Sequence, residues 1–157
     1  MDPLRAHLIR ALDWEEAHVS FEKAIEGIPA DRRGSPVAGF EHTLWQLLEH
    51  MRVAQKDLLE FCVDAKYVHT RKWPDDYWPQ QPAPPGESAW NDSVADFRAD
   101  RDRLKELIRS RGLDLYATVP TGKDKQTYLR AILLVVDHNA YHLGQLVAVR
   151  RALGVWG

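Results

Sequence analysis

The chain has 157 residues, so we expect one domain over residues 1–157 that buries a sizeable core. Its 21 basic and 23 acidic residues give a formal net charge of -2 and are spread along the chain, which leaves no basic field for a phosphate backbone and excludes nucleic acid as a partner. Cys62 is the only cysteine, which excludes an intrachain disulfide and a zinc site built from several thiolates.

The N-terminal segment predicts a first helix. Asp2 and Pro3 form a favourable helix start, because a capping acid precedes proline at the first helical position. Apolar residues then recur at helical spacing as far as Ile25, before Gly27 and Pro29 end the pattern. The segment carries acidic residues early and has no long apolar core, so it predicts neither a signal peptide nor a membrane anchor. We therefore expect a cytoplasmic protein with no membrane partner.

A second helical stripe predicts a helix over about residues 41–63, after a loop rich in helix breakers. His50 lies three residues after Leu47 and four before Ala54. It therefore falls on or beside the buried face of this helix.

The segment after the second helix contains five prolines and four large aromatic side chains. No regular element tolerates that density of proline. The aromatic side chains give the segment area to bury, which argues against disorder. We expect residues 67–85 to form an ordered loop that packs against one end of the bundle and shapes access to a substrate.

Two further helices complete the predicted fold. Ser88 can cap a third helix, which ends at Gly112. A short extended piece at residues 116–119 leads to a last helix from Thr127 to Leu153, apolar on nearly every side and so expected to be surrounded by others. Four helical stripes with one long crossover predict an all-α fold, a four-helix bundle with a long aromatic and proline-rich loop between helices two and three.

Three histidines on these helices are candidate metal ligands. His138 and His142 lie one turn apart on a stripe of the last helix, and His50 would join them from the second helix. Three imidazoles leave at least one position of a divalent ion open, which is the pattern of catalytic sites, whereas structural sites are closed by four ligands. The alternative is a hydrogen-bonded histidine cluster in the core.

Two other kinds of metal site are excluded by the residues beside these histidines. Di-iron carboxylate bundles need Glu three residues before each ligating His, but those positions hold Leu47, Val135 and Asn139. The zinc-protease pattern HExxH also fails, because Asn139 follows His138.

Several short motifs occur together in this chain. They are LLEH at Leu47–His50 with Ala54 and Gln55, DHNAYHLGQL at Asp137–Leu146, WPDDYWP at Trp73–Pro79, and AW with FR at residues 89–90 and 97–98. In this combination the chain resembles the DinB family, within the DinB/YfiT-like superfamily, over nearly its whole length. The His-x3-His-x-Gly-Gln arrangement of the last helix carries most of the resemblance.

The resemblance implies a four-helix bundle, often a homodimer, that binds one divalent ion, zinc or nickel foremost, through His50, His138 and His142. It also implies a transferase activity on a small electrophilic substrate, with a low-molecular-weight thiol whose sulfur coordinates the metal. Expression in a stress response is a further implication. The family name implies neither polymerase activity nor DNA binding.

Other polar residues are candidates for supporting roles. Gln145 could orient a ligand or simply pack, and Tyr141 reaches either a helix seam or the pocket, with the core favoured. His18, placed on the buried side of helix one, is a candidate fourth ligand or acid/base group. His42 and His69 have no partner at ligand spacing and are expected at the surface. No residue is assigned a catalytic role.

Three functions are compatible with these observations. The first is a metal-dependent transferase that uses a thiol. A metal-dependent hydrolase would use water in the same place. The third is a non-catalytic stress-response bundle. It either binds a metal or a small ligand and acts through dimerisation, or is an interaction module whose histidines are structural.

Overall fold

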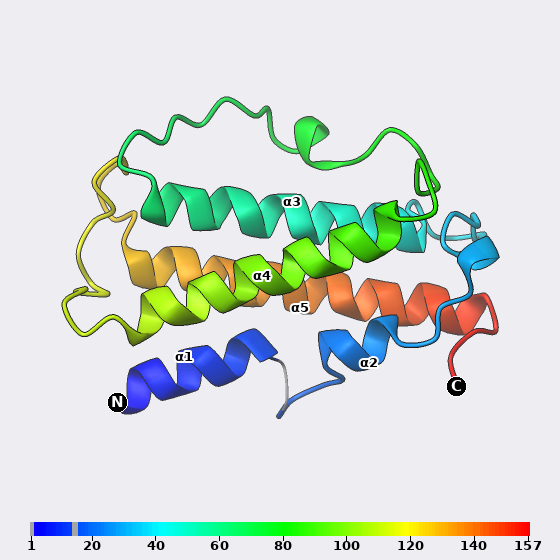
Figure 1. The fold of residues 1–157 in the computed structure, drawn as a ribbon, viewed down its shortest axis with the longest axis horizontal. Coiled ribbons are helices and arrows are strands. Elements are labelled where there is room, and N and C mark those ends of the chain that lie inside the picture. The colour runs from blue at the N-terminus through cyan, green and yellow to red at the C-terminus, as the bar shows by residue number, and fades with distance from the viewer. Residues whose placement is uncertain (1, 14–15) are drawn as a thin grey trace.

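The computed structural model describes residues 2–13 and 16–157, and its regular elements are helices (Figure 1). They are α1 (Pro3–Asp13), α2 (Phe21–Ile25), α3 (Leu44–Val63), α4 (Ala89–Arg109), α5 (Tyr128–Ala152) and two short 3-10 helices, η1 (Ala30–Arg32) and η2 (Asp75–Tyr77). An isolated β-bridge joins Thr118, within the expected extended piece, to Thr127, the N-cap of α5. The all-α prediction is confirmed.

Side-chain caps define where the helices that carry the histidines begin. Thr43 and Gln46 form a capping box at the start of α3, each side chain accepting a hydrogen bond from the backbone N–H of the other. The Thr127 hydroxyl accepts from the backbone N–H of Arg130 at the start of α5. Ser88 stands at the expected N-cap of α4, although its side chain makes no capping hydrogen bond.

The prediction of one continuous first helix is wrong. α1 ends at Asp13, and α2 begins at Phe21 behind Ser20, whose hydroxyl accepts from the backbone N–H of Lys23. Serine competes for backbone hydrogen bonds inside a helix and favours the cap position, so it restarts the helix here. Residues 14 and 15, which the prediction included, lie outside the described residues. Three long helices and two short ones thus take the place of four continuous helices.

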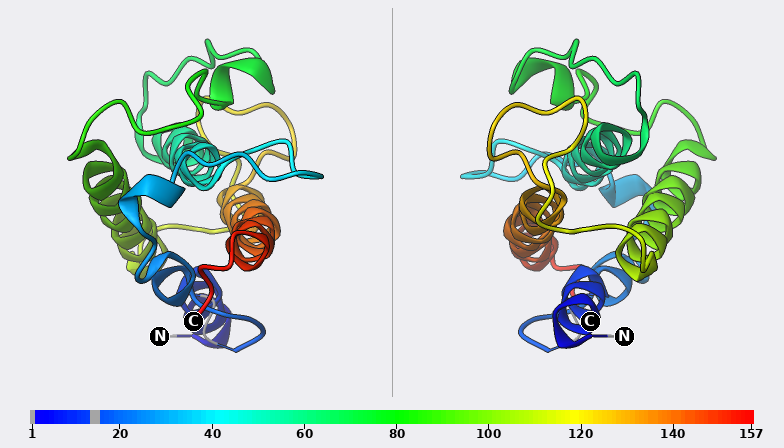
Figure 2. Two further views of the ribbon diagram at one scale, coloured as in Figure 1. Left: turned by 90° about the vertical axis from the view of Figure 1, so that its right-hand side faces the viewer. Right: turned by 90° about the vertical axis from the view of Figure 1, so that its left-hand side faces the viewer.

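The core lies between the three long helices. α3 packs against both α4 and α5, and α1 packs against α4 and α5 at the side opposite to the long loop (Figure 2). One apolar cluster joins Met51, Phe97 and Leu143 of the three long helices, and a second joins Leu12 of α1 to Ile132 of α5. Burial of this area stabilises the helices that carry the histidines. The described helices include none with the length and apolar character that a membrane span requires.

The aromatic and proline-rich loop runs back along the length of α3, so the expectation that it packs against one end of the bundle is wrong (Figure 1). Polar side chains of α3 and its N-cap hold successive loop carbonyls, because the proline-rich backbone has few internal partners for them. These bonds run from Thr43 Oγ1 to Pro82 O (2.5 Å), from Gln46 Nε2 to Pro79 O (3.2 Å) and from His50 Nδ1 to Tyr77 O (3.0 Å).

Candidate metal centre

The three histidines expected to bind a metal meet between α3 and α5. His50 projects from α3, and His138 and His142 project from successive turns of α5. One ring nitrogen from each lies within 4.8 Å of the others, and the Nε2 atoms of His50 and His138 are 2.9 Å apart. The three side chains could hold a metal ion. Because α3 and α5 pack side by side, two rigid helices set the distance between the ligands.

Hydrogen bonds on the far side of two rings fix which nitrogen faces the centre. His50 Nδ1 lies 3.0 Å from the carbonyl oxygen of Tyr77, and His142 Nδ1 lies 2.6 Å from Oε1 of Gln145. Both partners are acceptors, so each Nδ1 carries the proton and each Nε2 keeps its lone pair. This is the arrangement that orients histidine ligands in metal sites.

Burial keeps the three imidazoles neutral. His50 is 1% exposed and His142 is 7% exposed. Removal from water lowers the pKa of His50 to about 3 and that of His142 to about 4, with the neighbouring histidines adding to both shifts, and burial also lowers the pKa of His138. A metal ion binds neutral imidazole, so no imidazolium proton has to be lost at neutral pH. The donor set therefore fits one divalent transition-metal ion with an open position.

A tryptophan from the long loop covers one face of His50. The Trp78 ring is stacked on His50, with ring centroids 3.7 Å apart, and its other face is stacked on His42 at 3.6 Å. The three flat rings restrain the orientation of His50 and exclude water from that side. The expectation that His42 is an isolated surface residue is wrong, because the loop folds over it.

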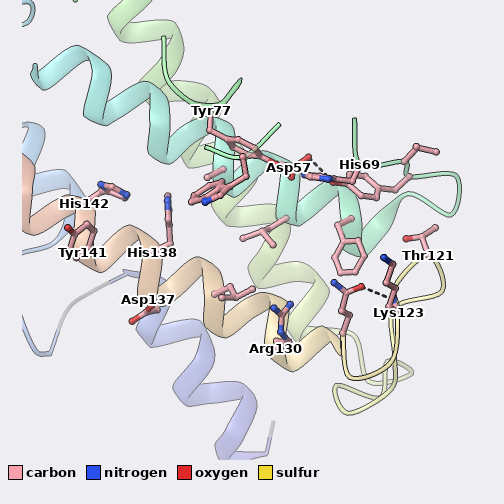
Figure 3. A pocket seen from close by; sticks show the side chains of 18 residues that line it. Asp57, His69, Tyr77, Thr121, Lys123, Arg130, Asp137, His138, Tyr141 and His142 are labelled. Carbon is pink, nitrogen blue, oxygen red and sulfur yellow. Dashed lines mark hydrogen bonds between the residues drawn. The ribbon is translucent and has the colours of Figure 1, made fainter. Parts of the chain in front are cut away.

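The centre opens into a cavity of about 890 Å³ between α3, α5, the long loop and the segment before α5 (Figure 3). His138 and His142 line one part of it. Much of the wall is apolar or aromatic, and its non-polar residues are Ala54, Leu58, Phe61, Val68, Trp73 and Leu134. A small molecule in this cavity can reach the nitrogen atoms of two of the three histidines.

A hydrogen-bonded cluster in the cavity was missed by the sequence analysis. Asp57 accepts hydrogen bonds from the hydroxyls of Tyr67 (2.9 Å) and Tyr77 (2.6 Å), and Nε2 of His69 lies 3.0 Å from the Tyr77 hydroxyl. His69 is exposed, as expected, and it also lines the cavity, where the Tyr77 hydroxyl is its partner. The available signal was that Asp57 follows His50 by seven residues, which puts both on one face of α3.

The other candidates fall in different places. Gln145 hydrogen-bonds His142, and its Nε2 donates to the Tyr141 hydroxyl at 3.4 Å. Tyr141 is 64% exposed and lines the cavity beside His142, so the preference for a core position is wrong. His18 lies in an exposed bend, with Nδ1 2.9 Å from the carbonyl oxygen of Val19. Its expected burial on helix one is wrong because α1 ends before it.

The comparison with known families agrees with the motifs. No curated protein and no solved structure matches the chain. A family model of the DinB superfamily matches residues 13–146, which is more than half of the chain and includes all three histidines of the centre. The chain therefore belongs to the DinB superfamily.

Proposed function

We propose that this protein is a metal-dependent transferase that joins a low-molecular-weight thiol to a small electrophile. His50, His138 and His142 would hold one divalent ion, zinc or nickel. The observation that supports the proposal is a set of three neutral imidazoles whose ring nitrogens lie within 4.8 Å of one another beside a cavity of small-molecule size.

A divalent ion in this place would supply acidity, because a thiol bound to it is deprotonated near neutral pH and becomes a nucleophile. The thiolate sulfur would form a bond to the electrophilic carbon as the bond from that carbon to its leaving group breaks. The leaving group would take the electron pair, and the thiol proton would pass to water.

The chain's own residues hold the reactants and keep water out. The Tyr77 carbonyl oxygen accepts the Nδ1 proton of His50, and Gln145 Oε1 accepts that of His142, so both imidazole rings are held in one orientation. Trp78 covers the face of His50. The apolar wall, with Phe61 and Trp73, would bind the electrophile's carbon skeleton next to the histidines.

The thiol in this proposal comes from outside the protein. Cys62 is buried in an apolar cluster with Val119 and Ala131 and does not line the cavity. Burial raises the pKa of its thiol to about 12. A protonated, enclosed thiol is a poor nucleophile.

The homodimer implied by the family resemblance stays a prediction. Sedimentation equilibrium of the purified protein over a range of concentrations would test it.

The experiment on function starts with elemental analysis of tag-free protein purified without chelator. Wild type is compared with a His138→Ala, His142→Ala variant and with His7→Ala, which removes an exposed imidazole of α1. We expect about one divalent ion per chain in wild type and His7→Ala, and none in the double variant. The same samples are then assayed for conjugation of a thiol to a chlorinated nitrobenzene.

Each outcome separates the candidate functions. Metal and conjugation that are lost together support the transferase. Metal with ester hydrolysis but no conjugation supports the hydrolase, and metal with no turnover supports the non-catalytic bundle. Wild-type protein that takes up neither zinc nor nickel on titration would overturn the transferase and the hydrolase and leave a non-catalytic bundle whose histidines are structural.

A further inference from the structure

One end of the cavity carries two cationic side chains, Lys123 and Arg130. Lys123 lies in the segment before α5 and Arg130 in the first turn of α5, and both line the same cavity as His138. Figure 3 shows both on the side away from His142. The backbone N–H of Lys123 donates to Gln126 Oε1, and that of Arg130 donates to Thr127 Oγ1. Neither charged side-chain group forms an ion pair with a carboxylate of the described residues.

The cationic end and the histidine end are separated by an apolar floor. Arg130, Leu134 and His138 follow one another at intervals of four residues on α5 and all line the cavity, so they lie along one face of the helix. Eight residues separate Arg130 from His138, which is about 12 Å along the helix axis at 1.5 Å per residue. Leu58 and Phe61 of α3 also line the cavity and add to its apolar wall.

Neither acidic side chain of the cavity lining forms an ion pair with these two cations. Asp57 already accepts hydrogen bonds from the hydroxyls of Tyr67 and Tyr77. Asp137 lines the cavity and also a neighbouring hollow beside Arg130, but it forms no ion pair with Arg130 or Lys123 among the described residues. The two cations therefore have no acidic partner within the cavity. Both are exposed, so an anion from solution can reach them beside an apolar surface.

We propose that the cavity binds an elongated small molecule with an apolar middle and an anionic group at one end, held by Lys123 and Arg130. Its other end reaches His138 and His142. The anionic group is a carboxylate or a phosphate, which the two cations recognise by the same chemistry. The proposal rests on the proposed function in one respect, namely that the end at the histidines is the reacting end.

The charge requirement is tested with three ligands of one chain length: decanoate, decyl phosphate and neutral decanol. Each displaces a neutral fluorescent naphthylamine from the protein as purified. We expect both anions to bind roughly ten-fold more tightly than decanol. The tighter of the two identifies the preferred anionic group.

Two variants test which residues provide the preference. The Lys123→Gln, Arg130→Gln double variant should bind all three ligands equally. Arg111→Gln, which removes an exposed cation outside the cavity, should keep the wild-type preference. Equal binding of anions and decanol to wild type, or an unchanged preference in the double variant, would overturn the proposal.

A thiol probe separates this inference from the proposed function. Mercaptodecanoate should bind zinc-loaded wild type more tightly than decanoate, and His138→Ala, His142→Ala should remove that gain while keeping the preference for anions. If mercaptodecanoate binds no more tightly than decanoate while anions still bind more tightly than decanol, the proposed function fails and the anion site stands. If mercaptodecanoate binds more tightly than decanoate, but the Lys123→Gln, Arg130→Gln double variant binds it as tightly as wild type does, the anion site fails.

Discussion

Tyr77 of the long loop is tied to α3 at two points, since its carbonyl oxygen lies 3.0 Å from Nδ1 of His50 and its hydroxyl lies 2.6 Å from Oδ2 of Asp57. His50 and Asp57 are two turns apart on the same helix. A single loop residue thus connects a candidate metal ligand to a carboxylate that makes no contact with the centre. The docking of the loop and the orientation of the His50 ring are therefore coupled.

Asp57→Ala should weaken metal binding. Without the carboxylate, the Tyr77 hydroxyl keeps only His69 as a partner, so the loop holds the carbonyl that orients His50 less firmly. We expect zinc affinity to fall about ten-fold, at the low end for groups that orient histidine ligands. Zinc affinity is measured by competition with a chromophoric chelator. Tyr67→Phe is the matched control, because it removes the other hydroxyl on Asp57 and leaves the Tyr77 bond intact. Wild-type affinity in Asp57→Ala would contradict the coupling.

Gln145→Ala should also weaken zinc binding, by about 10- to 100-fold, because Nδ1 of His142 loses its acceptor. Gln145→Glu keeps an acceptor at the same distance along the side chain and should restore the affinity. The same chelator competition reports both. If the alanine and glutamate variants bind zinc equally, the bond between Gln145 and His142 has no role in binding.

Cys62 should be unreactive in the folded protein. Only the thiolate attacks alkylating reagents, and burial raises the pKa of Cys62 to about 12, so at pH 8 the thiol is protonated. We expect iodoacetamide to modify Cys62 slowly in native protein and quickly in urea, as followed by mass spectrometry. Cys62→Ala should retain thiol conjugation at the wild-type rate. Alkylation of the native protein as fast as that of free cysteine would refute this account.

The Asn139 side chain should contribute to stability without binding metal. Its Nδ2 donates to Oε1 of Gln55 at 3.0 Å, and Gln55 Nε2 donates to the Phe97 carbonyl at 2.8 Å, so the amides link all three long helices inside the core. Asn139→Ala leaves Gln55 Oε1 buried without a donor, which should lower the free energy of unfolding by about 1 to 3 kcal/mol. Urea unfolding in the presence of chelator measures this.

Asn91→Ala, at an exposed position of α4, is the control for that experiment and should change the free energy of unfolding by no more than about 0.5 kcal/mol. Identical urea midpoints for wild type and Asn139→Ala would show that the amide link contributes nothing.

The sequence carried the helical periodicity and the histidine spacing, and these led to the all-α fold and to the three side chains that meet. His138 and His142 are one turn apart on any helix, and His50 joins them because it lies on the face of α3 that packs against α5. The break at Ser20 was missed because apolar periodicity continues through it, whereas the serine cap favours a restart.

The rest of the cavity could not be predicted because its contacts leave little trace in the sequence. The loop binds α3 through backbone carbonyls of Tyr77, Pro79 and Pro82, which every residue type possesses. Lys123 reaches the cavity because the segment before α5 folds back beside it, whereas Arg130 lies on the face of α5 that carries His138.

The stack of His42, Trp78 and His50 gives the candidate centre a natural optical reporter. An ion bound to His50 would sit beside an indole ring, so paramagnetic nickel or copper would quench its emission and diamagnetic zinc would leave most of it. Fluorescence titration of wild type against Trp78→Phe would therefore distinguish which kind of ion is bound without any added dye.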